Sequence, residues 1–180
     1  YSKSGEGEAK VQKTLSGRAC TAEDSFEFTI APVGEAPAFS NPTVTVTKDS
    51  TNFTESFGNV TFTEAGTYEW TVSETHKGET INGVAYDSAD KTITIKVVDD
   101  GKGNLVADTN SALVQTVAFT NTYSKSGEGE AKVQKNLSGR AWTAEDSFEF
   151  TITPVGEAPA FPTPTVTVTK DSTNFTESLR

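Results

Sequence analysis

The chain repeats itself, and this repeat constrains the fold more than any other feature of the sequence. Residues 1–58 align without gaps on residues 123–180 at an offset of 122, and the copies differ at only seven positions, which are 14, 20, 31, 40, 41, 57 and 58. Solenoid repeats have shorter periods of about 20–50 residues, so this period indicates a tandem array of domains. We therefore predict a complete repeat over 1–122 and the N-terminal half of a second, near-identical repeat over 123–180.

Short segments of alternating apolar and polar residues, separated by turns, fill the repeat. The segments 25–30 and 91–98 each place apolar side chains on one face. No long segment keeps the 3.6-residue period of a helix, and Gly58-Asn59 is predicted to form a turn between strands. Many short strands at this spacing predict an all-β fold, and specifically an antiparallel β-sandwich of the immunoglobulin-like type.

Three of the predicted strands carry one polar side chain in an otherwise apolar row. Residues two apart in a strand share a face, so these polar side chains point into the core with their apolar neighbours. The strands are 9–15, 67–74 and 117–123, and their inward polar residues are Lys13, Glu74 and Asn121.

These three side chains have complementary chemistry. An unpaired buried ammonium is costly, so a buried lysine loses its proton or finds a partner. A neutral Lys13 amine is a nucleophile, the Asn121 carboxamide is an acyl donor, and a protonated Glu74 can polarise the amide and transfer protons. Taken singly, each is better explained as a strand-end residue bonded to backbone or water. Their joint occurrence favours an isopeptide bond.

The motifs that contain these residues resemble a known family. They read Val-x-Lys-x-Leu-x-Gly-Arg at 11–18, Gly-Thr-Tyr-x-Trp-x-Val-x-Glu at 66–74 and Phe-x-Asn-Thr-Tyr at 119–123. This pattern is similar to the streptococcal-type pilin isopeptide-linkage domain of Gram-positive surface proteins, over 1–122 and again over the first half of the domain at 123–180.

The resemblance implies a role for each residue. Lys13 would supply the amine, Asn121 the acyl group and Glu74 the catalytic acid, within an immunoglobulin-like sandwich of a pilus or adhesin stalk. The second copy has its own lysine, Lys135, but stops before any counterpart of Glu74 or Asn121. Because the bond would form once per domain without turnover, we do not expect an enzyme in the usual sense.

We therefore expect a structural stalk repeat of a bacterial pilin or adhesin, outside the cell on a fibre anchored to the cell wall. Its partners would be neighbouring repeats of the same surface protein. The alternative is an adhesin domain whose loops bind a host protein or glycan, and a ligand-binding assay on a single repeat would distinguish the two. Near-identical repeats favour the stalk.

Charge and composition argue against other classes of function. A net charge of −10 argues against nucleic acid or an anionic membrane as partner. No apolar run approaches the roughly 20 residues that span a bilayer, and no signal peptide opens the chain, so we expect a mature fragment or an excised piece. One histidine, His76, and one cysteine, Cys20, leave no basis for an imidazole-rich metal site or an internal disulfide, and no cofactor is expected.

The incomplete second repeat leads us to expect a binding partner. Residues 123–180 contain the lysine strand but lack the strands that would cover its apolar face, and such a piece exposes core surface and strand edges. We expect the covering strands to come from another copy by strand exchange, or from the remainder of the same protein after a cut. The cut would lie at Leu179-Arg180, which replaces the Phe57-Gly58 turn. In that case Lys135 would be bonded to an asparagine on the severed piece.

Overall fold

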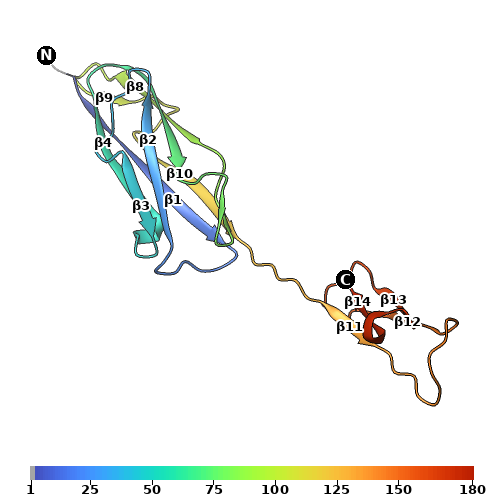
Figure 1. Ribbon diagram of the computed structural model, residues 1–180. Coiled ribbons are helices and arrows are strands. Elements are labelled where there is room, and N and C mark those ends of the chain that lie inside the picture. The colour runs from blue at the N-terminus through green and yellow to red at the C-terminus, as the bar shows by residue number, and fades with distance from the viewer. Residues whose placement is uncertain (1–2) are drawn as a thin grey trace. The chain divides into compact units, whose positions relative to one another are not determined.

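A computed structural model describes residues 3–180 and divides the chain into two compact units, one ending at Lys125 and one comprising Ser126–Arg180. The first unit is a sandwich of two five-stranded sheets (Figure 1). One sheet is ordered β4 (Thr54–Phe62), β1 (Gly5–Ser16), β10 (Val114–Tyr123), β7 (Val84–Ala85) and β6 (Thr80–Ile81). The other is ordered β3 (Thr43–Thr47), β2 (Ser25–Val33), β5 (Gly66–Glu74), β8 (Lys91–Asp99) and β9 (Leu105–Ala107). The predicted all-β, immunoglobulin-like sandwich is confirmed.

Strict alternation along the strands builds the core between the two sheets. In β8 the inward row is Ile93, Ile95 and Val97, all nearly inaccessible, while the residues between them face solvent. β-Branched and aromatic side chains suit such a half-buried pleated surface. Trp70 on β5 is the largest fully buried side chain and packs edge-on against Phe39 with ring centroids 5.1 Å apart.

The first and last strands of this unit lie side by side. β1 pairs with β10 in parallel and with β4 in antiparallel orientation, and Lys13 lies opposite Phe119 in the parallel register. A parallel pair needs a long crossover connection, and here the whole chain between β1 and β10 provides it. The register of this pair decides which core side chains of the two strands can touch.

The turn predicted at Gly58-Asn59 is wrong, because β4 continues through both residues. Asn59 pairs with Glu8 of β1, and the register of the pair shifts immediately beyond Glu8. Gly58 has a φ of 82°, and a Cβ there would lie 2.0 Å from the Ser40 hydroxyl oxygen. The glycine therefore marks an irregularity inside a continuous strand.

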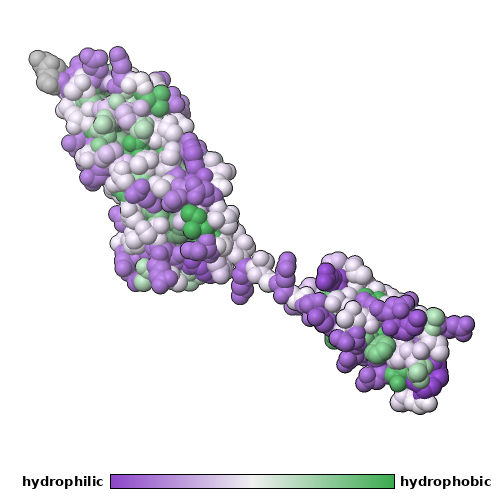
Figure 2. Space-filling view, viewed as in Figure 1, coloured by the Kyte–Doolittle hydropathy of each residue, from purple (hydrophilic) through white to green (hydrophobic). Residues whose placement is uncertain are grey.

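The second unit repeats the strand pairs of the first without its core. β11 (Ala131–Gln134) pairs with β14 (Thr176–Leu179), and β12 (Ser147–Thr151) pairs with β13 (Thr165–Thr169). A 3-10 turn, Thr51–Phe53 in the first unit and Thr173–Phe175 in the second, precedes the equivalent strands. Among the hydrophobic residues 126–180, only Val168 and Leu179 are buried. Figure 2 shows hydrophobic side chains at the surface of this unit.

Candidate functional site

Lys13, Glu74 and Asn121 meet in the core of the first unit. Lys13 and Asn121 come from the neighbouring strands β1 and β10 of one sheet, and Glu74 is the last residue of β5 in the facing sheet. Within residues 3–180 these are the three polar or charged residues that are buried, with exposed fractions of 2%, 3% and 0%. The structure thus brings together the three residues that the strand patterns singled out.

One carboxylate oxygen joins the amine and the amide. Glu74 Oε1 accepts a hydrogen bond from Lys13 Nζ at 2.8 Å and another from Asn121 Nδ2 at 2.8 Å. The other oxygen, Oε2, is buried and has no hydrogen-bond partner among the described residues. The glutamate therefore contacts both nitrogens that an amide exchange would involve.

Aromatic rings surround the amine. Lys13 Nζ lies 5.0 Å from the ring centroid of Phe26 and 5.5 Å from that of Phe28. Phe119, opposite Lys13 on β10, packs against Phe28 with centroids 5.0 Å apart. These rings keep water from the three polar side chains and lower the local dielectric, which strengthens every electrostatic interaction among them.

Burial shifts both ionisable groups toward their neutral forms. It lowers the pKa of the Lys13 amine, against the opposing effect of Glu74, and it raises the pKa of Glu74, against the opposing effects of Lys13 and Asn121. A charged carboxylate would also leave Oε2 ionised, buried and unpaired, which is costly. A neutral amine beside a protonated acid is the arrangement in which the lysine is nucleophilic and the glutamic acid can give a proton.

A fourth group was not predicted from the sequence. The backbone N–H of Asp87 donates a hydrogen bond to Asn121 Oδ1 at 2.8 Å. Asp87 lies in the polar loop after β7, and its own Oδ1 accepts the N–H of Ala89 at 3.0 Å. An aspartate two residues before its backbone partner is a turn signal, but that signal does not identify the loop's target in the core.

The lysine of the second unit has one of these neighbours. Lys135 is half-buried, and its Nζ lies 4.7 Å from the ring centroid of Phe148, the counterpart of Phe26. Its backbone N–H donates to the carbonyl oxygen of Phe175. The lysine strand and the phenylalanine strand of the repeat thus come together in this unit much as they do in the first.

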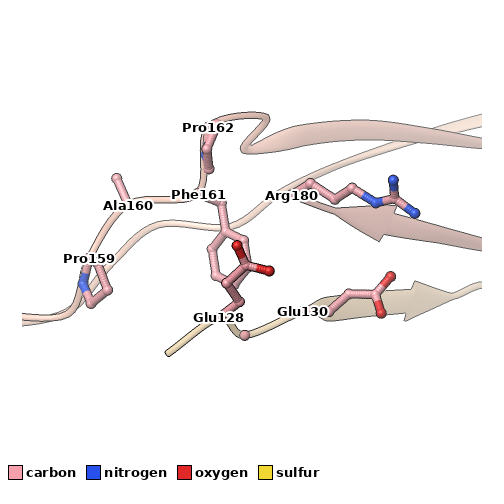
Figure 3. Close-up of a pocket in the computed structure, with 8 residues that line it drawn as sticks. Glu128, Glu130, Pro159, Ala160, Phe161, Pro162 and Arg180 are labelled. Carbon is pink, nitrogen blue, oxygen red and sulfur yellow. The ribbon is translucent and has the colours of Figure 1, made fainter. Parts of the chain in front are cut away.

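A pocket of about 670 Å³ opens in the second unit (Figure 3). Phe161 belongs to the Pro159–Pro162 segment, and in this view its ring overlaps the Glu128 side chain. The pocket is lined by Glu128, Gly129, Glu130, Pro159, Ala160, Phe161, Pro162 and Arg180.

The equivalent positions of the first unit show what fills this space there. The Trp70 indole N–H donates to the Pro37 carbonyl oxygen at 2.7 Å, and the Trp70 ring packs on Phe39. A Cβ on Gly7 would lie 2.9 Å from the Phe62 ring, whereas one on Gly129 would meet nothing within 4 Å. The pocket therefore corresponds to the space that the side chains of Trp70 and Phe62 occupy in the complete sandwich.

The single cysteine does not have the surroundings of a reactive thiol. Cys20 is half-buried, and burial raises the pKa of its thiol, which disfavours the reactive thiolate. In the described part of the chain, no three His, Cys, Asp or Glu residues gather as a metal site would require. Nor does that part contain a helix long and apolar enough to cross a membrane.

The chain belongs to the FctA family, described as the Spy0128-like isopeptide-containing domain, which matches residues 9–124. Among solved structures it is similar to the major pilin from Streptococcus pyogenes, at 18% identity over 97% of this chain and 73% of that chain, with a TM-score of 0.41. It is also similar to the T-13 major pilin of the same organism, at 21% identity over 81% of this chain and 59% of that chain, with a TM-score of 0.41. No curated protein matches the chain.

Proposed function

We propose that the first unit is a shaft repeat of a bacterial surface pilus that hardens itself with an isopeptide bond between Lys13 and Asn121. Membership of an isopeptide-containing family supports this role. The observation that carries the chemistry is that Glu74 Oε1 bonds both Lys13 Nζ and Asn121 Nδ2 inside a dry, aromatic pocket. The repeat then works outside the cell, in a fibre anchored to the cell wall, with neighbouring subunits as partners.

The reaction is an amide exchange that needs no co-reactant. The neutral Lys13 Nζ attacks Asn121 Cγ, a new C–N bond forms, and the bond from Cγ to Nδ2 breaks. One proton passes from Nζ to Nδ2 through Glu74, Nδ2 leaves as ammonia, and the glutamic acid ends in the state in which it began. Folding holds amine and amide together, where effective molarities can reach about 10⁵–10⁸ M. The site reacts once and does not turn over.

Intact mass spectrometry tests this proposal. The 180-residue chain should weigh less than its translated sequence by one ammonia, and proteolysis should release a branched peptide joining Lys13 to Asn121. Glu74→Ala should fold and keep the full mass. Glu69→Ala is the matched control, because Glu69 lies on the solvent face of the same strand β5. An unmodified chain of full translated mass, or a Glu74→Ala chain that still loses ammonia, contradicts the mechanism.

We further propose that the second unit binds strands like those that complete the first. Its pocket is lined by the counterparts of the residues that contact Trp70 and Phe62 in the first unit. A partner would have to present the sequence type of 59–122, with a tryptophan strand for the pocket and an asparagine strand beside β11. If that partner also brings the glutamate, Lys135 would form the second bond.

Exchange of strands between copies of this chain alone would not increase the number of complete sandwiches. Each copy carries two lysine halves, 1–58 and 123–180, and only one segment of the 59–122 type. A second unit that captures this segment from another copy releases the first lysine half of that copy. The partner is therefore a segment of the 59–122 type that is not folded on its own lysine half.

Mixing the full chain with a separate 59–122 fragment tests this binding. We expect a complex, followed by a covalent adduct that proteolysis places at Lys135. Lys135→Arg should keep the complex but lose the adduct, and Trp70→Ala in the fragment should weaken both. A fragment that does not bind, or that binds equally well without Trp70, contradicts the assignment of the pocket.

A further inference from the structure

The loop after β7 and strand β10 are joined by reciprocal side-chain bonds at the edge of the site. The register of β7 on β10 pairs Ala85 with Thr122, so a continued ladder would place Asp87 opposite Thr120. Side chains replace the ladder at this point. Asp87 Oδ2 accepts the N–H of Thr120 at 3.3 Å, and Asn121 Oδ1 accepts the N–H of Asp87 at 2.8 Å.

We propose that the backbone N–H of Asp87 is the oxyanion donor of the cross-linking reaction, and that the Asp87 carboxylate positions it. This inference rests on the proposed isopeptide bond and adds a group that the lysine, glutamate and asparagine do not supply. The N–H touches Asn121 Oδ1, the oxygen on which negative charge develops when the amine attacks the carboxamide carbon.

The charge balance of the attack explains why such a donor is needed. As Lys13 Nζ bonds to Asn121 Cγ, the carbonyl electron pair moves onto Oδ1, and it returns when Nδ2 leaves as ammonia. Glu74 Oε1 contacts Lys13 Nζ and Asn121 Nδ2. Asn121 Oδ1 instead accepts its hydrogen bond from the backbone N–H of Asp87. A preorganised N–H aimed at such an oxygen in a dry site stabilises the transition state more than the ground state.

The Asp87 carboxylate fixes the direction of its own N–H. Oδ1 accepts the Ala89 N–H within the loop and Oδ2 accepts the Thr120 N–H of β10, so the side chain both fixes the turn after Asp87 and ties the loop to β10. Lys91 Nζ lies 3.6 Å from Oδ2. Although burial opposes ionisation of this carboxyl, its hydrogen bonds to the two amides and the nearby charge of Lys91 lower its pKa, so it accepts these bonds as an anion.

A second aspartate in the same loop provides a contrast. Asp90 accepts bonds from the Ser73 hydroxyl at 2.7 Å and from Lys77 Nζ at 2.8 Å, so it also ties the loop to a neighbouring element. Its partners touch none of the reacting atoms. If the loop aspartates only stabilise the fold, removing either carboxylate should affect bond formation alike.

The decisive test replaces the Asp87 peptide N–H with an ester oxygen. The full chain is assembled by ligation under denaturing conditions and then folded, so that ammonia loss can be timed by intact mass. Removal of one oxyanion donor slows an acyl transfer by about 10²–10³-fold, and we expect a slowing of that order. The matched control is the same replacement at Tyr86, whose N–H donates to the Glu79 carbonyl oxygen at 2.8 Å, so that a backbone bond of the loop is lost while the Asp87 N–H and the bonds of its carboxylate are kept.

The rate of ammonia loss in side-chain variants tests the positioning role of the Asp87 carboxylate. Asp87→Ala should slow ammonia loss, Asp87→Asn should recover part of the rate because its oxygen can still accept the Thr120 N–H, and Asp90→Ala should leave the rate unchanged. An ester at 87 that cross-links as fast as the unmodified chain overturns the inference, and so does an equal slowing by the Tyr86 ester. If the unmodified chain never loses ammonia, the proposed function itself fails along with it.

Discussion

Lys13 and Asn121 lie on adjacent parallel strands, two register positions apart and on the same face. Lys13 is opposite Phe119, and Asn121 is opposite Leu15. The lysine side chain therefore reaches forward along the neighbouring strand to its partner, and both meet the glutamate of the facing sheet. A bond between these residues would tie the first strand of the sandwich to the last.

The rate of bond formation should depend on pH with a maximum. The reactive pair holds one proton, on Glu74 with Lys13 neutral, and burial moves each group toward that form. Acid adds a proton to the amine and alkali removes the proton from the acid, so the rate should fall on both sides. Timed mass spectrometry during the first folding of the chain, over a range of pH, measures this profile. A rate that keeps rising through the alkaline range would exclude Glu74 as the acid.

Loss of the bond should lower stability substantially. A cross-link between Lys13 and Asn121 closes a loop of about 100 residues, for which the chain-entropy model gives about 4.7 kcal/mol. Lys13→Met removes the bond while keeping a side chain of similar length, so the cavity term is small. We expect the free energy of unfolding in urea to fall by roughly 4–5 kcal/mol. Lys10→Met, on the outer face of β1, should change it little, and reductant should have no effect on the parent.

In the Lys13→Met variant, stability should decrease as the pH rises. Burial raises the pKa of Glu74 above its ordinary value of 4.5, and removing Lys13 removes an interaction that opposes this shift. The folded state then binds the proton more tightly than the unfolded state. As the pH rises above about 4.5, the free energy of unfolding therefore falls, until the pH exceeds the pKa of Glu74 in the folded state. Urea unfolding at several pH values measures the slope. The Lys13→Met/Glu74→Gln double variant should lack this component, and equal slopes for the two variants would contradict the raised pKa.

Mechanical extension should be limited by the same bond. A force applied at the two ends of the first unit passes along β1 to Lys13, crosses to Asn121 and leaves through the end of β10, so residues 14–120 carry no load. Single-molecule pulling of the parent should not release their contour length, which is roughly 360 Å at 3.3–3.6 Å per residue. Glu74→Ala should release it. A parent that extends by the full length contradicts the bond.

The apolar rows of the strands predicted much of the fold and the three polar core residues. Alternation decides which face a side chain takes, so Lys13, Glu74 and Asn121 could be assigned to the interior before any strand was paired. The parallel pairing of β1 with β10 was beyond this reasoning, because a period of two says nothing about which strands are neighbours. Gly58 was misread because a glycine in a strand irregularity has the same local signature as one in a turn. The proposed role of Asp87 depends on a backbone amide, which every residue of this loop possesses, so no residue type marks it in the sequence.

The place of the Lys13–Asn121 contact along β1 has a consequence for how a fibre of such repeats absorbs a sudden pull. The contact lies near the end of β1, so Gly5–Gln12 precede it and are held to β4 and β10 by hydrogen bonds and packing alone. With the proposed bond formed, these eight residues could detach from β4 and β10 and return, but a strand is already extended at about 3.3 Å per residue, so their release would add little length along the strand. Such a repeat would act as a nearly inextensible link, in which breaking the weak contacts of β1 dissipates part of the load while the covalent bond keeps the core closed.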